Sequence, residues 1–209
     1  MAPRAGHVPA KAKSIIFLFM AGGPSQLEMF DWKPKLKELD GQTFPESFTK
    51  GQQLAQLQNA VLKARGAFTA FKQHGQAGTE VSELFPHIGS IADDLCVIRS
   101  MHTDAINHDP AITFFQTGSQ LPGRPSMGAW TDYGLGRMND NLPSFVVLVS
   151  TNKERSGQGL LARLWGSGYL PSSHQGVQFR SSKDPVLFLN DPPGMTRSDR
   201  RGMLDDLGQ

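Results

Sequence analysis

Three short, largely apolar segments constrain the fold of this chain more than any other feature of its sequence. They are residues 14–20 (SIIFLFM), 95–99 (LCVIR) and 144–150 (SFVVLVS). Runs of this length, rich in β-branched and aromatic side chains, are typical of parallel strands that are covered on both faces. Because helical patterns lie between the runs, the sequence predicts an α/β fold in which all three are neighbours in one mostly parallel sheet.

The helix signals between the apolar runs differ in strength. Residues 82–94 carry apolar side chains at helical spacing. Asp109 and Pro110 are suited to the cap and the first position of a second helix, which we expect to end at Gly118. Residues 42–78 are polar and Gln-rich, and they predict an excursion over the surface without regular structure.

Composition narrows the classes of protein that remain. Of the 209 residues, 38% are hydrophobic, which is enough for a folded core. Lys and Arg number 21 against 19 Asp and Glu, and this balance disfavours nucleic acid or an anionic membrane as the main partner. The single cysteine, Cys96, excludes a disulfide framework and a cage of thiolate ligands built from this chain alone.

The start of the sequence admits two interpretations. Residues 1–13 are rich in Pro, Ala and Lys and predict a flexible lead-in to one domain over residues 14–209. Basic residues followed by the apolar run 15–21 also imitate a secretory signal peptide, but the run is minimal and a buried strand explains it better. With seven residues it is far shorter than the roughly 20 that a transmembrane helix needs.

The end of the sequence resembles an unfinished element. Residues 196–199 (TRSD) are suited to cap a helix whose apolar residues have barely begun when the sequence stops. We therefore expect the chain to be the N-terminal part of a larger domain.

The turn after the first apolar run is a candidate anion site. Gly22 and Gly23 allow a close approach of backbone N–H groups to a ligand, and Ser25 adds a hydroxyl that is a candidate catalytic group. The alternative is an ordinary tight exit from a strand, with Ser25 as a local cap.

The loop after the second run concentrates side chains that bind metals. His102, Asp104, Asn107 and His108 fall within seven residues, and their nitrogen and oxygen atoms suit a divalent ion such as Ca²⁺, Mg²⁺ or Zn²⁺. We take His102, Asp104 and His108 as candidate metal ligands, Asn107 as an anion-binding residue and His108 also as a catalytic group. The alternative for His108 is an ordinary hydrogen-bonded loop histidine. Since parallel strands end at the same edge of a sheet, this loop is expected close to Gly22 and Gly23.

Three stretches resemble a known family. They are IIFLFMAGGPSQLEMFDWKPKL, RSMHTDAINHDPAITFFQTG and GRPSMGAW. They are similar to the bacterial family catalogued as domain of unknown function 1501, which is grouped with sulfatases in the alkaline phosphatase-like superfamily. The resemblance implies a three-layer α/β/α sandwich and export to the periplasm or beyond.

The comparison with sulfatases also shows where the chemistry departs. Gly22 and Gly23 stand where sulfatases have two metal-binding aspartates, and His108 stands where their nucleophile is found, followed by Pro110, Thr117 and Gly118 at the family spacing. His108 could serve there as nucleophile, metal ligand or general base.

The resemblance implies a metal-dependent hydrolase of sulfate or phosphate esters. By their own chemistry Arg124, Arg137 and Arg163 are unranked candidates to clamp an anionic ester, and the alternative for each is an ordinary surface ion pair. The alternative is a non-catalytic exported protein that binds sulfated polysaccharide or another anionic cell-envelope ligand. A third interpretation is that this stretch of chain has no activity by itself, because half of the site is missing, and for the isolated chain we favour it.

Overall fold

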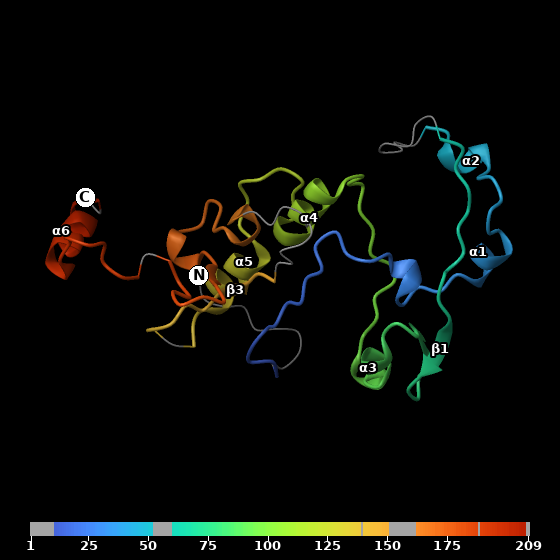
Figure 1. Cartoon of the computed structure of the whole chain (residues 1–209), viewed down its shortest axis with the longest axis horizontal. Helices are drawn as coiled ribbons and strands as arrows, with labels where there is room; N and C mark the ends of the chain where they lie inside the picture. The colour runs from blue at the N-terminus through green and yellow to red at the C-terminus, as the bar shows by residue number, and fades with distance from the viewer. Residues whose placement is uncertain (1–10, 52–59, 139, 151–161, 188, 208–209) are drawn as a thin grey trace. The chain divides into compact units, whose positions relative to one another are not determined.

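The computed structural model describes residues 11–51, 60–138, 140–150, 162–187 and 189–207 (Figure 1). Most of the lead-in predicted for residues 1–13 lies outside these ranges. The chain divides into two compact units, one built mainly from Val8–Phe115 and the other mainly from Pro122–Gln209. We call them the N-terminal and the C-terminal unit and describe each by itself.

The N-terminal unit combines short helices with a β-hairpin. Its elements in chain order are η1 (Gln26–Glu28), α1 (Pro34–Glu38), α2 (Glu46–Thr49), β1 (Phe71–His74), β2 (Thr79–Ser82), α3 (Pro86–Gly89), η2 (Ala92–Asp94) and most of α4 (His108–Thr117). Figure 1 shows α3 beside the hairpin, where the two elements are in contact. Val81 of β2 is completely buried and marks the small core of this unit.

The hairpin forms where the sequence predicted irregular surface chain. Its strands pair antiparallel, with Phe71 opposite Ser82 and His74 opposite Thr79. The turn closes because Gly75 adopts a φ of 69°, which favours glycine, and because Asp93 accepts the N–H of Gln76 at 2.8 Å. The prediction for residues 42–78 is therefore wrong over the hairpin, whose turn is stabilised by a carboxylate distant in sequence.

The C-terminal unit contains two longer helices and a parallel strand pair. Its elements are α5 (Met127–Leu135), β3 (Val146–Leu148), η3 (Ala162–Trp165), η4 (Ser172–His174), β4 (Val177–Phe179) and α6 (Arg197–Leu207). β3 and β4 pair in parallel, with Val146 opposite Val177. Ala129 of α5 and Leu164 of η3 are buried between these elements.

The structure is thus mixed α/β, with one antiparallel and one parallel strand pair in the described residues. The expected strand at 144–150 is confirmed as β3, but its partner is β4. Residues 14–20 and 95–99 form no strand, and no described strand pairs with them. The prediction that the three runs share one sheet is therefore wrong for this structure.

The first apolar run packs by its aromatic rings instead of by strand pairing. Phe17 and Phe19 each stack on Phe115 of α4, with ring centroids 5.8 and 5.5 Å apart. Phe17 and Phe19 alternate along the extended chain, so both rings lie on the side that faces Phe115. Ile16 and Leu18 lie on the other side and are 85% and 87% exposed. A strand needs a neighbouring edge for its backbone groups as well as apolar side chains, and the run contacts a helix.

Two of the predicted helices, the one that ends at Gly118 and the one after residues 196–199, are confirmed. α4 begins at His108, one residue before the predicted cap, and ends before Gly118, which has a φ of 72°. α6 follows Thr196, whose hydroxyl accepts the N–H of Asp199 at 3.2 Å. The helix predicted over residues 82–94 is broken, because its first residues belong to β2 and the remainder forms α3 and η2. No helix in the described part of the chain is long and apolar enough to cross a membrane.

Candidate functional site

Asp132 is the only charged residue that is buried among those described, with an exposed fraction of 5%. It lies in α5, three residues after the fully buried Ala129, so both point to the inner side of the helix. Ser126 fixes the start of α5, since its hydroxyl accepts the N–H of Ala129 at 3.3 Å. A buried carboxylate costs free energy unless hydrogen bonds and charges compensate it.

Three side chains supply that compensation. Nδ1 of His174, at the end of η4, lies 2.5 Å from Oδ2 of Asp132. The hydroxyl of Ser144 donates a hydrogen bond to Oδ1, and Nε of Arg137 lies 3.5 Å from the same oxygen. We call these four residues the Asp132 centre. They come from α5, from the chain that follows it, from the segment before β3 and from η4.

The electrostatics of the centre keep Asp132 ionised. Burial of the carboxyl acts to raise its pKa, but the hydrogen bonds from Ser144 and His174 and the positive charge of Arg137 outweigh burial. The pKa of Asp132 therefore lies below its ordinary value. An ionised carboxylate only accepts hydrogen bonds, so the proton of neutral His174 is placed on Nδ1 and the lone pair on Nε2.

His174 is held firmly and still reached by solvent. Its side chain is 19% exposed, and its ring lies nearly perpendicular to that of Tyr133, with ring centroids 5.4 Å apart. Contacts on both Nδ1 and the ring fix the orientation of the imidazole. Nε2 is then the nitrogen left to exchange a proton with a ligand.

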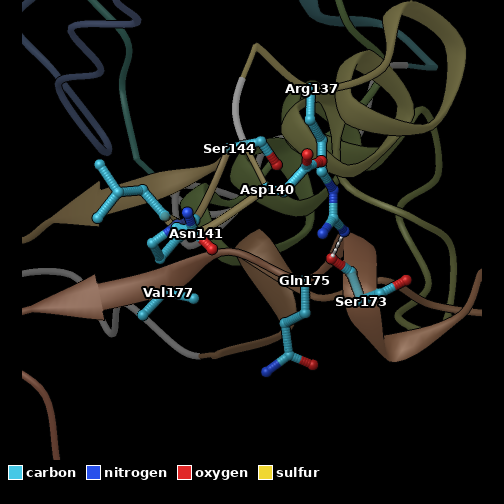
Figure 2. A pocket seen from close by; sticks show the side chains of 9 residues that line it. Arg137, Asp140, Asn141, Ser144, Ser173, Gln175 and Val177 are labelled. Carbon is cyan, nitrogen blue, oxygen red and sulfur yellow. Dashed lines mark hydrogen bonds between the residues drawn. The ribbon is translucent and has the colours of Figure 1, made fainter.

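A pocket of about 250 Å³ lies beside the centre. Arg137 and Ser144 line it together with Asp140, Asn141 and Ser173. Figure 2 shows the guanidinium of Arg137 reaching the main chain of Ser173, whose carbonyl accepts a hydrogen bond from Nη2 at 2.5 Å. A small polar ligand in this pocket would meet hydroxyl, amide, carboxylate and guanidinium groups. Ser173 and Gln175, the chain neighbours of His174, both line the pocket.

The predicted glycine turn is formed, and much of it is used for local structure. Gly22 has a φ of 68°, and the N–H of Gly23 donates to the carbonyl of Met20 at 2.9 Å. Ser25 caps η1, with its hydroxyl 3.3 Å from the N–H of Leu27. The capping alternative for Ser25 is therefore realised, whereas its catalytic role stays a prediction.

The predicted metal-binding residues lie in an exposed loop that leads into α4. His102, Asp104, Asn107 and His108 are all exposed, and the carbonyl of Asn107 accepts the N–H of Ala111 at 3.1 Å. Within the described residues, no group of three or more His, Cys, Asp or Glu side chains is arranged to hold a metal ion. The ligand set, and the closeness of this loop to Gly22 and Gly23, stay predictions.

Sequence reasoning missed Asp132 and His174 and left Arg137 unranked. The two partners of the central hydrogen bond are 42 residues apart, so no local motif joins them. One signal was present: in the largely apolar stretch MGAWTDYGL the aspartate is the one charged residue, and a carboxylate among apolar side chains needs a specific partner.

Comparison with known proteins gives a family and no assigned activity. Neither a curated protein nor a solved structure matches the chain. A sequence profile of the family described as "Protein of unknown function (DUF1501)" matches residues 12–209. Because the match covers nearly the whole chain, the protein belongs to this DUF1501 family.

Proposed function

We propose that the protein is a hydrolase of sulfate or phosphate esters in which His174, oriented by Asp132, transfers the proton. The observation that carries this proposal is the 2.5 Å contact between Nδ1 of His174 and the buried carboxylate of Asp132. A carboxylate that fixes the tautomer and the orientation of a histidine is a recurring arrangement in hydrolases. The ester class follows from the resemblance to sulfatases.

The reaction step that fits this geometry uses water as the nucleophile. Nε2 of His174 takes a proton from a water molecule while the water oxygen attacks the sulfur or phosphorus atom. The bond to the ester oxygen breaks, and the imidazolium returns the proton to the leaving alkoxide. Arg137 has five N–H donors. Its Nε faces Asp132 and one N–H of Nη2 serves Ser173, and the remaining donors can face the charge of the transferred group.

Other parts of the proposal rest on the resemblance alone. They are the sulfatase-like assignment, the three-layer α/β/α sandwich and export from the cytoplasm. Roles for His108 and Ser25 rest in addition on the polar residues around them in the sequence. The family fold also implies a divalent metal ion, but the described residues gather no fitting set of ligands.

The test compares two histidine variants on aryl sulfate and aryl phosphate. We expect the wild-type chain to hydrolyse one of them and His174→Gln to lose about 10²- to 10⁴-fold in rate, the usual contribution of a general base. His87→Gln is the matched control, because His87 is exposed and lies in α3 of the other unit. Circular dichroism checks that both variants are folded.

Two outcomes would contradict the assignment of His174. One is wild-type hydrolysis that survives in His174→Gln, and the other is a wild-type chain without activity on either ester. Loss of activity in His108→Gln with retention in His174→Gln would instead favour the loop before α4.

The second candidate is a non-catalytic protein that binds anionic polysaccharide or another cell-envelope ligand. A cluster of basic side chains in the N-terminal unit favours it. This cluster is remote in sequence from the Asp132 centre, and a binding function there does not depend on hydrolysis.

A further inference from the structure

A hollow of about 710 Å³ in the N-terminal unit gathers basic side chains. Lys37, Lys63 and Arg65 line it, and Asp40 is the one carboxylate among its lining residues. The ring of Phe68 also lines the hollow, and this residue is 69% exposed. The lining thus carries a net charge of plus two and one accessible aromatic ring. We call it the basic hollow.

Backbone hydrogen bonds bring the two halves of the basic hollow together. The N–H of Gly41 donates to Ala64, that of Ala64 to Gln42, and that of Phe44 to Leu62, at 2.8 to 2.9 Å. This ladder fixes the chain after α1 against residues 62–64. Lys63 and Arg65 alternate with Ala64 along the extended segment, so their side chains leave it on the same side.

A close backbone approach places Lys37 beside this segment. A Cβ at Gly66 would lie 3.1 Å from Cα of Lys37, so only a residue without a side chain fits easily there. Asp40 stabilises this contact between α1 and the segment of Gly66, because its Oδ1 accepts the N–H of Gly66 at 2.8 Å. The grouping of the three cations follows from ordered main-chain contacts between segments about 25 residues apart in the sequence.

The cations of the basic hollow differ from neighbouring lysines in having no ion pair. In and beside α1, Lys33 pairs with Asp31 at 2.7 Å and Lys35 pairs with Glu38. Within the described residues, Lys37, Lys63 and Arg65 form no salt bridge. Three cations with one carboxylate among them leave like charges that repel one another, and a bound anion reduces that repulsion.

We propose that the basic hollow binds a segment of an acidic polysaccharide. Two or more sulfate or carboxylate groups would match its surplus of positive charge, and the exposed ring of Phe68 offers a flat apolar surface to a sugar ring. The whole chain has a formal charge of only +2, so the surplus of positive charge in this lining is a local feature and not part of a strongly basic chain. A local field of this kind suits a short acidic oligosaccharide better than the extended backbone of a nucleic acid. The proposal stands independently of hydrolysis at the Asp132 centre.

The experiment measures binding of a labelled, size-defined heparin oligosaccharide to the full chain by fluorescence anisotropy. We expect binding that weakens with salt and is lost when the oligosaccharide is desulfated. Lys37→Ala and Lys63→Ala should each weaken binding several-fold and lower the slope of log K against log salt by about one, as for other linear polyanions. Phe68→Ala should weaken binding without changing that slope.

Lys35→Ala is the matched control, since Lys35 is two residues from Lys37 in the same helix but is paired with Glu38 and does not line the hollow. It should bind as the wild type does. Equal losses in Lys35→Ala and Lys37→Ala, or no binding by the wild type, would overturn the proposal. Tighter binding of a single-stranded oligonucleotide of equal charge would overturn the assignment of the ligand as a polysaccharide.

Discussion

Replacing Asp132 by Asn tests the electrostatics of the centre directly. The substitution keeps the shape of the side chain, and it removes the charge that His174, Ser144 and Arg137 surround. Asn retains one acceptor oxygen, so the donors on one side of the group are kept and those on the other side meet an NH₂ group. Hydrogen bonds to a charged group contribute about 1.5–3 kcal/mol each, and we expect Asp132→Asn to lower the free energy of unfolding by about 2–3 kcal/mol at neutral pH.

The effect should depend on pH in one direction. The pKa of Asp132 is lowered in the folded state from its ordinary value of 3.8, so its contribution is present above that value and is lost as the pH falls through the folded-state pKa. Urea unfolding followed by circular dichroism, at about pH 7 and about pH 3, measures the difference between wild type and variant. That difference should be large at the higher pH and shrink at the lower one.

The control is Asp205→Asn, which breaks the exposed pair between Asp205 and Arg201 in α6. Surface pairs of this kind contribute about 0–1 kcal/mol, so this variant should unfold almost as the wild type does. Equal unfolding midpoints for wild type and Asp132→Asn at neutral pH would refute the reasoning. The same difference at both pH values would show that the charge of Asp132 is not its source.

Two further predictions concern single contacts. Gly168→Ala should destabilise the C-terminal unit by more than about 1 kcal/mol in urea unfolding, because Gly168 has a φ of 56° and a Cβ there would lie 2.4 Å from the nitrogen of Pro125; an unchanged midpoint would contradict it. Thr196→Ala should raise the pKa of Asp199, which is lowered mainly by hydrogen bonds from Thr196. An NMR titration of the Asp199 carboxyl measures the shift, and an unmoved titration midpoint would argue against these bonds.

Local signals predicted the helices better than the sheet. The start of α6 was predictable because Thr196 and Asp199 cap each other through neighbouring groups, and the end of α4 was predictable because Gly118 takes up a left-handed conformation. These interactions form between residues that are close in the sequence, so a local sequence pattern is enough to predict them.

Strand pairing could not be predicted in the same way. β3 carried an apolar signal, but its partner β4 is a three-residue strand. Gly176 precedes β4, and a Cβ there would lie 2.8 Å from Cγ2 of Val147, so the partner needs a glycine for its approach. The apolar content of a strand does not by itself predict which other strand it pairs with.

The Asp132 centre escaped prediction for a related reason. A loop with several polar residues close together in the sequence, such as residues 102–108, predicts a binding site from local sequence alone. The buried carboxylate and the histidine that it orients are brought together only when α5 and η4 pack. The hydrogen bonds and the lowered pKa of Asp132 depend on this packing, which no local sequence pattern shows.

The exposed run at residues 14–20 has a consequence for the behaviour of the protein at high concentration. It is uncharged, free of proline and rich in β-branched and aromatic residues, and no described strand satisfies its backbone. Segments of this kind are templates for pairing with a second copy and for the growth of fibrils. The formal charge of +2 provides little mutual repulsion between molecules. Self-association through this segment, rather than loss of the fold, is therefore expected to set the solubility limit of the protein.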